Sequence, residues 1–383
     1  MHILYIYAEV TIKGGTDKVL VEKANWLVNH GYEVTILTEA QMGRPLSFVL
    51  DDKVRHVDMG LDFNKQYSKG ALKRFMIYFS LMKEYKKLLN RTLLELHPDI
   101  VITAMGRSLS LLSAMKDGSI KIGESHTTKT HLRSLHLMEE KGGLFFLVAK
   151  YMRWKMCRSA SKLSALVLLT QKDAYDWKNI TKTYVIPNPI SFYPEEAAKL
   201  DNKQVIMVGR YNVAKGYDYL IPAWEIVHRR HPDWILQVFG SGELHDDVVR
   251  WVKERHLEQT IILNDPTDHI MEKYLESSIC VLSSRYEGFS LVIIESMSCG
   301  VPVVSFDCPH GPRNIIRNEE DGLLIEYLNT QALANGICRL IEDEELRKCL
   351  GEKARLNILR FSKDNIMNRW DMLLKKLKED HDN

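Results

Sequence analysis

Short apolar runs alternate along the chain with longer stretches of helical periodicity. The first runs cover residues 2–8 and 32–38, and the stretch between them has helical spacing that stops at Gly31. Further apolar runs cover residues 98–104 and 165–170. Strand, helix and strand at this spacing predict parallel sheets with crossover helices.

Prolines interrupt this pattern near the middle of the chain. Pro187, Pro189 and Pro194 lie within eight residues, which is typical of an interdomain linker. The alternation then restarts, with a helix predicted at 216–232 and strands at 204–210, 234–240, 260–265, 279–284 and 301–306. Two Rossmann-like domains in tandem would bind a ligand in a cleft between them, at the carboxyl ends of the strands.

Composition agrees with this organisation. The chain has 383 residues, 45% hydrophobic and 27% charged, which fits two globular domains. Its six cysteines form no CxxC pair, so we expect reduced thiols in a cytosolic protein. The start is predicted to be a first strand and not a signal peptide, and the apolar run at 144–149 is far shorter than the ~20 residues of a bilayer span.

Charge is distributed unevenly between the two halves. Residues 1–186 carry 28 Lys and Arg against 18 Asp and Glu, whereas residues 187–383 carry 24 against 32. Two segments of the first half, Lys69 to Arg91 and residues 144–162, combine basic and apolar residues. Both suit peripheral docking on anionic lipid, although an amphipathic helix with a solvated basic face has the same pattern. A nearly neutral chain without a base-reading motif disfavours nucleic acid.

The stretch "EGFSLVIIE" places carboxylates, Glu287 and Glu295, at both ends of an apolar segment. Ser290 is positioned to cap a helix over 291–298, whose free N–H groups and dipole suit a phosphate. Gly288 permits close approach of a ligand to the backbone. A nucleotide sugar has hydroxyls on either side of a diphosphate, so each carboxylate could accept hydrogen bonds from one set of hydroxyls. Two surface glutamates that flank a core helix are the alternative.

Two cations follow a predicted strand of the second half. Arg210 and Lys215 could clamp a diphosphate, or they could belong to a solvated basic loop. Cys308 and His310 lie in one turn, but two candidate ligands do not make a metal site, so we predict no metal.

Taken in order, "GR…KG", "FGSGE", "SRYEGFSLVIIESMSCGVPVV" and "DGLLI" resemble retaining glycosyltransferases of the GT-B fold, in the group 1 or family 4 class. In the first half the resemblance rests on the loop with Gly14 and Gly15 and on "GESHTT". It implies two doubly wound domains facing a central cleft, over 1–187 and 188–360, and a C-terminal helix over 361–383 that crosses back to the first domain.

The resemblance also implies roles for individual residues. Glu295 would bind the ribose hydroxyls, Glu287 would contact the donor hexose, and Arg210 and Lys215 would neutralise the leaving diphosphate. His126 matches the active-site histidine, although a histidine at a strand end is often structural. The remaining donor-binding residues implied are Gly14, Gly15, Gly288, Phe289, Ser290 and Leu291.

The implied activity is transfer of a hexose from a nucleotide-diphosphate sugar, UDP-sugar favoured, to a glycan or lipid-linked acceptor with retained configuration. "CPHGPRNII" resembles enzymes that build capsule, O-antigen or lipopolysaccharide, which would act at the inner face of the cytoplasmic membrane. We expect no cofactor. A sugar-nucleotide epimerase, a phosphorylase or a non-catalytic binding module could share the fold. A Rossmann dehydrogenase is disfavoured because the first strand lacks G-x-G-x-x-G after it.

Overall fold

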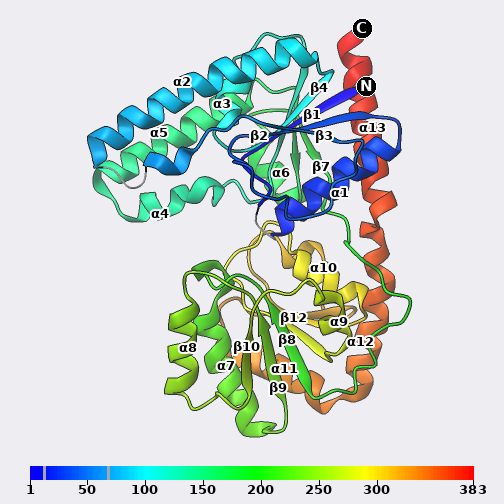
Figure 1. Ribbon diagram of the computed structural model, residues 1–383. Coiled ribbons are helices and arrows are strands. Elements are labelled where there is room, and N and C mark those ends of the chain that lie inside the picture. Colours follow the sequence, from blue (N-terminus) through cyan, green and yellow to red (C-terminus); the bar gives the residue numbers. More distant parts are fainter. Residues whose placement is uncertain (12–13, 67–69) are drawn as a thin grey trace. The chain divides into compact units, whose positions relative to one another are not determined.

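The computed structural model describes residues 1–11, 14–66 and 70–383, with the backbone alone for Ala71 and Leu72. Lys69, the first residue of the predicted basic segment, lies outside these ranges. The chain divides into two compact units, each with its own parallel sheet. Unit 1 comprises Met1–Ile186 and Met367–Asn383, and unit 2 comprises Pro187–Ile366 (Figure 1).

Unit 1 contains a seven-stranded sheet in the order β3-β2-β1-β4-β5-β6-β7. Its strands are β1 (His2–Tyr7), β2 (Glu33–Thr38), β3 (Arg55–Asp58), β4 (Ile100–Ala104), β5 (Ile120–Glu124), β6 (Ala165–Leu168) and β7 (Thr183–Val185). Its helical segments are α1 (Gly15–Asn29), η1 (Phe63–Gln66), α2 (Ala71–Leu96), α3 (Ser108–Leu112), η2 (Leu132–Ser134), α4 (Leu135–Glu140), α5 (Gly143–Ala160), α6 (Gln171–Trp177) and the greater part of α13 (Lys363–Asp382).

Unit 2 contains a six-stranded sheet in the order β10-β9-β8-β11-β12-β13. Its strands are β8 (Gln204–Val208), β9 (Ile235–Phe239), β10 (Ile261–Asn264), β11 (Ile279–Leu282), β12 (Val303–Phe306) and β13 (Gly322–Ile325). Its helical segments are η3 (Val213–Lys215), α7 (Tyr217–Arg230), α8 (His245–Glu254), α9 (Ile270–Leu275), α10 (Leu291–Ser298), η4 (Pro312–Asn314), α11 (Thr330–Glu342), α12 (Glu344–Asn357) and η5 (Ile358–Phe361).

Strand order locates one topological switch point in each sheet. In unit 1 the chain builds outward from β1 through β2 to β3, and then crosses to β4 on the other side of β1. In unit 2 it builds from β8 to β10 and then crosses to β11 on the other side of β8. Ligands of open α/β sheets bind at such points, outside the carboxyl ends of the strands. The prediction of two doubly wound α/β domains is confirmed.

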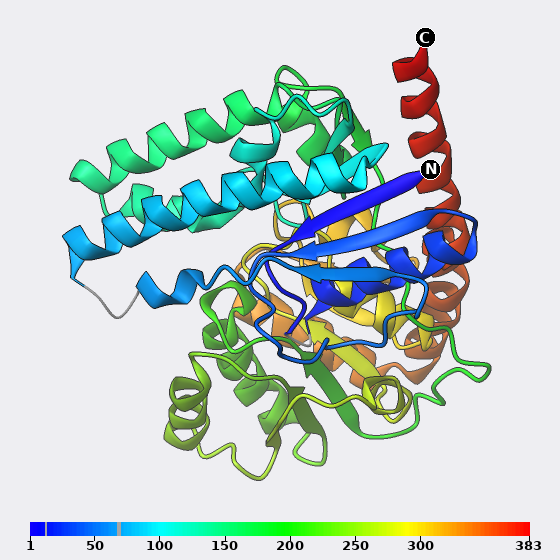
Figure 2. The same cartoon turned by 45° about the horizontal axis from the view of Figure 1, so that its top comes forward.

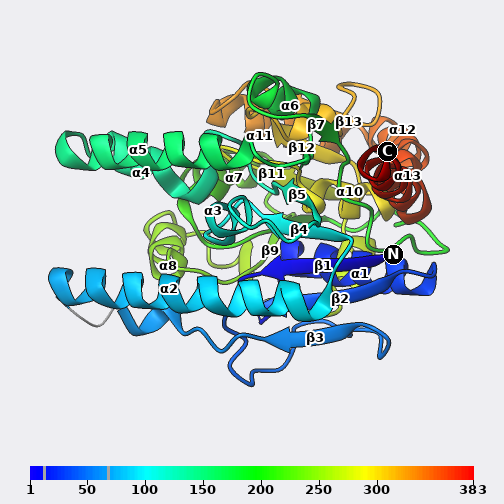
Figure 3. The ribbon, with the colours of Figure 1, turned by 90° about the horizontal axis from the view of Figure 1, so that it is seen from above.

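Helix α2 has two parts with different surroundings. Tyr85, Leu89 and Leu93 are fully buried against the sheet of unit 1, and each such side chain contributes roughly 1.5–3 kcal/mol through burial. The earlier Phe75 and Phe79 are exposed. Figures 2 and 3 show that α2 and α5 both continue past the ends of the strands, in the same direction. None of the described helices is long and apolar enough to span a bilayer.

Most strands lie where the apolar runs predicted them, but four had been missed: β3, β5, β7 and β13. The edge strands β3 and β7 are partly exposed, so they lack a continuous apolar run. In β5, the charged Lys121 interrupts the apolar run. Lys121 can nevertheless be buried because its ammonium pairs with Asp117 at 2.7 Å. The cost of burying a charge is offset by such a partner.

Candidate functional site

The switch point of unit 2 brings two predicted residues together. After β8, Lys215 ends the short helical turn η3, and after β11 the chain leads into the loop that carries Glu287. Lys215 Nζ lies 2.7 Å from Glu287 Oε1, and the Ser284 hydroxyl donates to the same oxygen at 2.7 Å. Both charged side chains are largely buried, with 18% and 12% exposure. Glu287 is therefore held in place from both sides of the switch point.

Close backbone packing supports this pair. Gly216 follows Lys215 with φ of +65°, and a Cβ atom there would lie 2.1 Å from the carbonyl oxygen of Ser283. Gly311 leaves a similar space, because its Cβ would lie 2.5 Å from the Cβ of Glu287. The backbone of Glu287 also forms an isolated parallel bridge with His310. Any larger side chain at these glycines would displace the pair.

Arg210 lies apart from this pair in its contacts. Its side chain is exposed and forms no ion pair with the residues that the structure describes. A diphosphate clamp by Arg210 together with Lys215 thus remains a prediction.

Cys308, one of the two candidate metal ligands considered from the sequence, is buried. Burial raises the pKa of its thiol far above the usual range.

Helix α10 spans the residues predicted for it, but its cap differs from the prediction. Ser290 is the N-cap residue, yet its side chain makes no hydrogen bond to the first turn. The Ser290 hydroxyl is buried and has no hydrogen-bond partner among the described residues. Phe289 is buried against the ring of Phe361, whereas Gly288 and Leu291 remain partly exposed. A buried hydroxyl without a partner is unfavourable, so a water molecule or a ligand that accepts or donates a hydrogen bond here would stabilise this end of α10.

Glu295, inside α10, is also buried, with 8% exposure. The phenol of Tyr274 on α9 is fully buried beside it. Burial raises the pKa of Tyr274, and the charge of Glu295 raises it further, so the phenol is neutral. The two carboxylates of "EGFSLVIIE" thus have different surroundings: a lysine and a serine for Glu287, a tyrosine for Glu295.

In unit 1, the predicted residues lie after β1 and β5. Gly14 is the N-cap residue of α1 and Gly15 its first residue, so this loop follows β1 at the switch point. The intervening Ile12 and Lys13 lie outside the described residues. His126 follows β5, and its Nε2 lies 3.5 Å from Glu124 Oε1. Its Nδ1 is buried without a hydrogen-bond partner in the described part of the chain.

Glu124 is the centre of a buried charge cluster that the sequence did not reveal. Lys23 of α1 donates to Glu124 at 2.5 Å, and its ammonium lies 3.9 Å from the ring centroid of Trp370 on α13. Burial opposes ionisation of Glu124, but the charge and hydrogen bond of Lys23 outweigh it and hold the pKa of Glu124 below the usual range. Burial lowers the pKa of His126, so the imidazole is neutral near pH 7.

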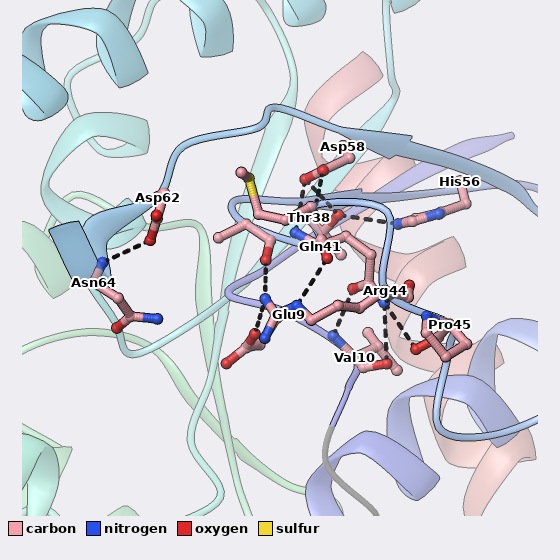
Figure 4. Close-up of polar contacts among 12 residues, drawn as sticks. Glu9, Val10, Thr38, Gln41, Arg44, Pro45, His56, Asp58, Asp62 and Asn64 are labelled. Atoms are coloured by element: carbon pink, nitrogen blue, oxygen red, sulfur yellow. Dashed lines mark hydrogen bonds and ion pairs between the residues drawn. The ribbon is translucent and has the colours of Figure 1, made fainter.

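A hydrogen-bond network joins the loops after β1, β2 and β3 of unit 1 (Figure 4). Gln41, 3% exposed, accepts from the Val10 N–H at 3.0 Å. Asp58 accepts from the N–H of Gln41 at 2.9 Å and from the Thr38 hydroxyl at 3.2 Å. Burial opposes ionisation of Asp58, but these donors lower its pKa. Arg44 pairs with Glu9 at 2.5 Å, which adds a second link between the loops after β1 and β2.

Sequence reasoning missed the partners of the predicted residues. The contacts described above are made by Ser284, Tyr274, Lys23 and Glu124. None of these residues belongs to a local sequence pattern that predicts its contact. Ser284 alone had a signal, because it ends a predicted strand next to the loop of Glu287. The others come from separate helices and strands, so their contacts depend on the tertiary fold.

Comparisons with known proteins identify the family and the fold. The family model for group 1 glycosyl transferases matches residues 191–357. An uncharacterized glycosyltransferase of Haemophilus influenzae is 30% identical over 94% of this chain and 96% of that protein. The amylovoran biosynthesis glycosyltransferase AmsD of Erwinia amylovora is 26% identical over 97% and 99%. A Staphylococcus aureus TarM mutant, solved with fondaparinux, α-GlcNAc-glycerol and UDP, has a TM-score of 0.78 at 18% identity, covering 97% of this chain and 99% of that chain.

Proposed function

Because the chain belongs to the group 1 glycosyltransferases of the GT-B fold, we propose that it transfers a hexose from a nucleotide-diphosphate sugar to a glycan or lipid-linked saccharide with retained anomeric configuration. A UDP-sugar is the favoured donor. The observation that carries the proposal is the Lys215–Glu287 pair at the switch point of unit 2. The AmsD relative, named for amylovoran biosynthesis, supports a role in cell-surface polysaccharide synthesis.

In this proposal the donor is bound by unit 2. Lys215 has three N–H donors and gives one to Glu287, so it keeps donors for a diphosphate. The N–H groups of Gly288 to Leu291 and the Ser290 hydroxyl hold the sugar and phosphates, and the exposed guanidinium of Arg210 closes on the leaving group. Glu295 accepts from the ribose hydroxyls. The TarM structure contains UDP, which supports the choice of nucleotide.

Catalysis then rests on fixed positive charge. As the bond to the anomeric carbon breaks, negative charge grows on the diphosphate, and Lys215, Arg210 and the amino end of α10 stabilise it. Preorganised donors of this kind are worth about 3 kcal/mol each. We propose that these groups make a divalent metal unnecessary. The leaving phosphate takes the proton of the acceptor hydroxyl in a front-face attack, and the neutral His126 serves as the active-site histidine.

We also propose that unit 1 docks on anionic membrane from the cytoplasmic side. Phe75, Met76 and Phe79 of α2 are 54–65% exposed, and helix α5 exposes Leu144, Phe145, Leu147, Tyr151 and Trp154. These apolar residues lie among lysines and arginines of the same two helices. Exposed apolar surface with basic neighbours suits the boundary between lipid tails and anionic headgroups.

Co-sedimentation with vesicles tests the docking. Wild-type protein should bind anionic vesicles and lose that binding when Lys73, Arg74, Lys83, Lys86 and Lys87 are changed to Glu, because each basic residue near the surface is worth about 1 kcal/mol. Equal binding to neutral and anionic vesicles would refute it.

A thermal-shift panel of nucleotide sugars tests the donor proposal. A ligand that binds only the folded protein raises its melting temperature. We expect a shift with one or more UDP-sugars that disappears in Lys215→Met. A panel in which no nucleotide sugar produces a shift would contradict the proposal.

A further inference from the structure

Two arginines in unit 1 lie near a single buried carboxylate. Glu39 follows β2 and is only 3% exposed. Arg107 follows β4, and its Nε lies 3.4 Å from Glu39 Oε2. Burial raises the pKa of the Glu39 carboxyl, and the positive charges of Arg107 and, less strongly, of Arg133 in η2 oppose that rise. One carboxylate thus pairs with Arg107 and also experiences the charge of Arg133, so positive charge exceeds negative charge in this cluster.

Arg107 is held in a defined position, yet its donors are largely unused. Its guanidinium lies 3.9 Å from the ring centroid of Phe63, and the Tyr85 hydroxyl fixes Glu39 at 2.9 Å. The two Nη groups of Arg107 make no hydrogen bond within the described ranges. The Arg107 side chain is 30% exposed, so these donors reach solvent. A planar guanidinium of this kind matches the oxygens of a phosphate.

The backbone at Arg133 is strained. Arg133 and Ser134 have φ of 54°, both in the left-handed region. This conformation costs roughly 1–2 kcal/mol per residue without glycine. Strain of this kind persists where the surrounding structure maintains it, often at ligand sites. Glycine or asparagine would relieve it, but either would remove the guanidinium.

The position of the cluster matches that of a ligand site. Glu39 and Arg107 follow β2 and β4, the two strands that flank β1, and the switch point of the sheet lies between β1 and β4. The carboxylate of Asp58, at the end of β3, accepts hydrogen bonds from the backbone N–H groups of Gln41 and Met42 (Figure 4).

We propose that Arg107 and Arg133 form an anion subsite for a phosphate or diphosphate group carried by the acceptor. The inference rests on the proposed function, in which unit 1 holds the acceptor. The same chemistry occurs in a lipid-linked diphosphate and in a polyol phosphate. In either case Glu39 is a positioning residue that orients Arg107, and the guanidinium groups contact the ligand.

The test uses the full chain with Arg210→Ala and Lys215→Ala, which removes the proposed donor clamp. Isothermal titration with inorganic pyrophosphate should still show one binding site. Arg107→Gln or Arg133→Asn should each weaken it at least about tenfold, as expected when a charged hydrogen bond is lost. No saturable binding, or equal affinity in all variants, would overturn the proposal.

Two controls separate binding from a structural role. Ser134→Gly relieves the same strain and keeps both arginines, so it should retain pyrophosphate affinity. Arg133→Asn should be as stable as its parent in urea unfolding, because asparagine tolerates the left-handed conformation. A loss of stability in Arg133→Asn with unchanged pyrophosphate affinity would mean that Arg133 is structural, and would overturn the proposal.

Further arms identify the source of the phosphate. Phosphatidylcholine vesicles containing a polyprenyl diphosphate represent the lipid, and glycerol phosphate represents the polyol. Binding of either that depends on Arg107 supports the subsite and names its ligand class, whereas binding of neither contradicts it. Pyrophosphate binding does not require turnover, so an inactive enzyme with an intact subsite would refute the proposed function alone.

Discussion

Substituting Glu287 and substituting Lys215 should have opposite effects on UDP binding. Glu287→Gln releases Lys215 from its ion pair, so the ammonium becomes fully available to a diphosphate. We expect UDP to bind at least as tightly as in the wild type, while turnover falls because the contact to the hexose is lost. Lys215→Met should weaken UDP binding and turnover together. Isothermal titration and initial rates measure these effects.

The strength of the Lys215–Glu287 interaction can be measured from the free energy of unfolding. Removing one partner of a buried ion pair costs about 3–5 kcal/mol, and because the pair retains 18% and 12% exposure, we expect the lower end for Lys215→Met. Lys215→Met/Glu287→Gln should recover most of this loss, since no unpaired charge remains. A double-mutant cycle by urea unfolding should therefore give a coupling of about 2 kcal/mol or more.

An exposed pair offers the matched control. Lys203 and Asp233 also lie in unit 2, but their side chains are 61% and 54% exposed. The same cycle there should give only about 0.2–1 kcal/mol. A coupling at Lys215–Glu287 no larger than this control, or loss of UDP binding in Glu287→Gln, would refute the reasoning.

Three further predictions follow from the described contacts. Glu295→Gln should weaken donor binding roughly tenfold, as a lost charged hydrogen bond to ribose would; titration with UDP-sugar measures this, and unchanged affinity would contradict it. Transfer should survive excess EDTA, since Lys215 and Arg210 supply the positive charge, whereas loss restored by Mg²⁺ would reject this. Burial raises the pKa of Asp173 to about 6. The folded protein therefore holds this proton more tightly, and stability should fall as pH rises from about 4 to 6, by up to about 3 kcal/mol. Asp173→Asn should abolish this fall in urea unfolding, and a fall that persists would exclude Asp173 as its cause.

The sequence predicted elements better than it predicted contacts. Apolar runs located β1, β8 and β11 because buried parallel strands are continuously apolar. The edge strands β3 and β7 lack that signal, since one side of each is partly exposed. The spacing of Glu287 and Glu295 indicated a ligand site, and the structure places Glu287 in the loop before α10 and Glu295 inside that helix.

The remaining parts of the sites come from the tertiary fold. Lys23 and Glu124 are 101 positions apart, and both are buried charged residues. Glu39 and Arg107 meet only because β2 and β4 flank β1. Local periodicity carries no information about such pairs, whereas strand order determines which loops become neighbours.

The central claim is retaining transfer from a nucleotide sugar, and product stereochemistry tests it most directly. The measurement is proton NMR of the reaction with an α-linked UDP-sugar and a polyprenyl diphosphate-linked saccharide, with the anomeric coupling of the first-formed product as the readout. The account predicts release of UDP together with an α-linked product in the wild type, and neither in Lys215→Met. A β-linked product, or release of UDP without a new glycosidic bond, would contradict it.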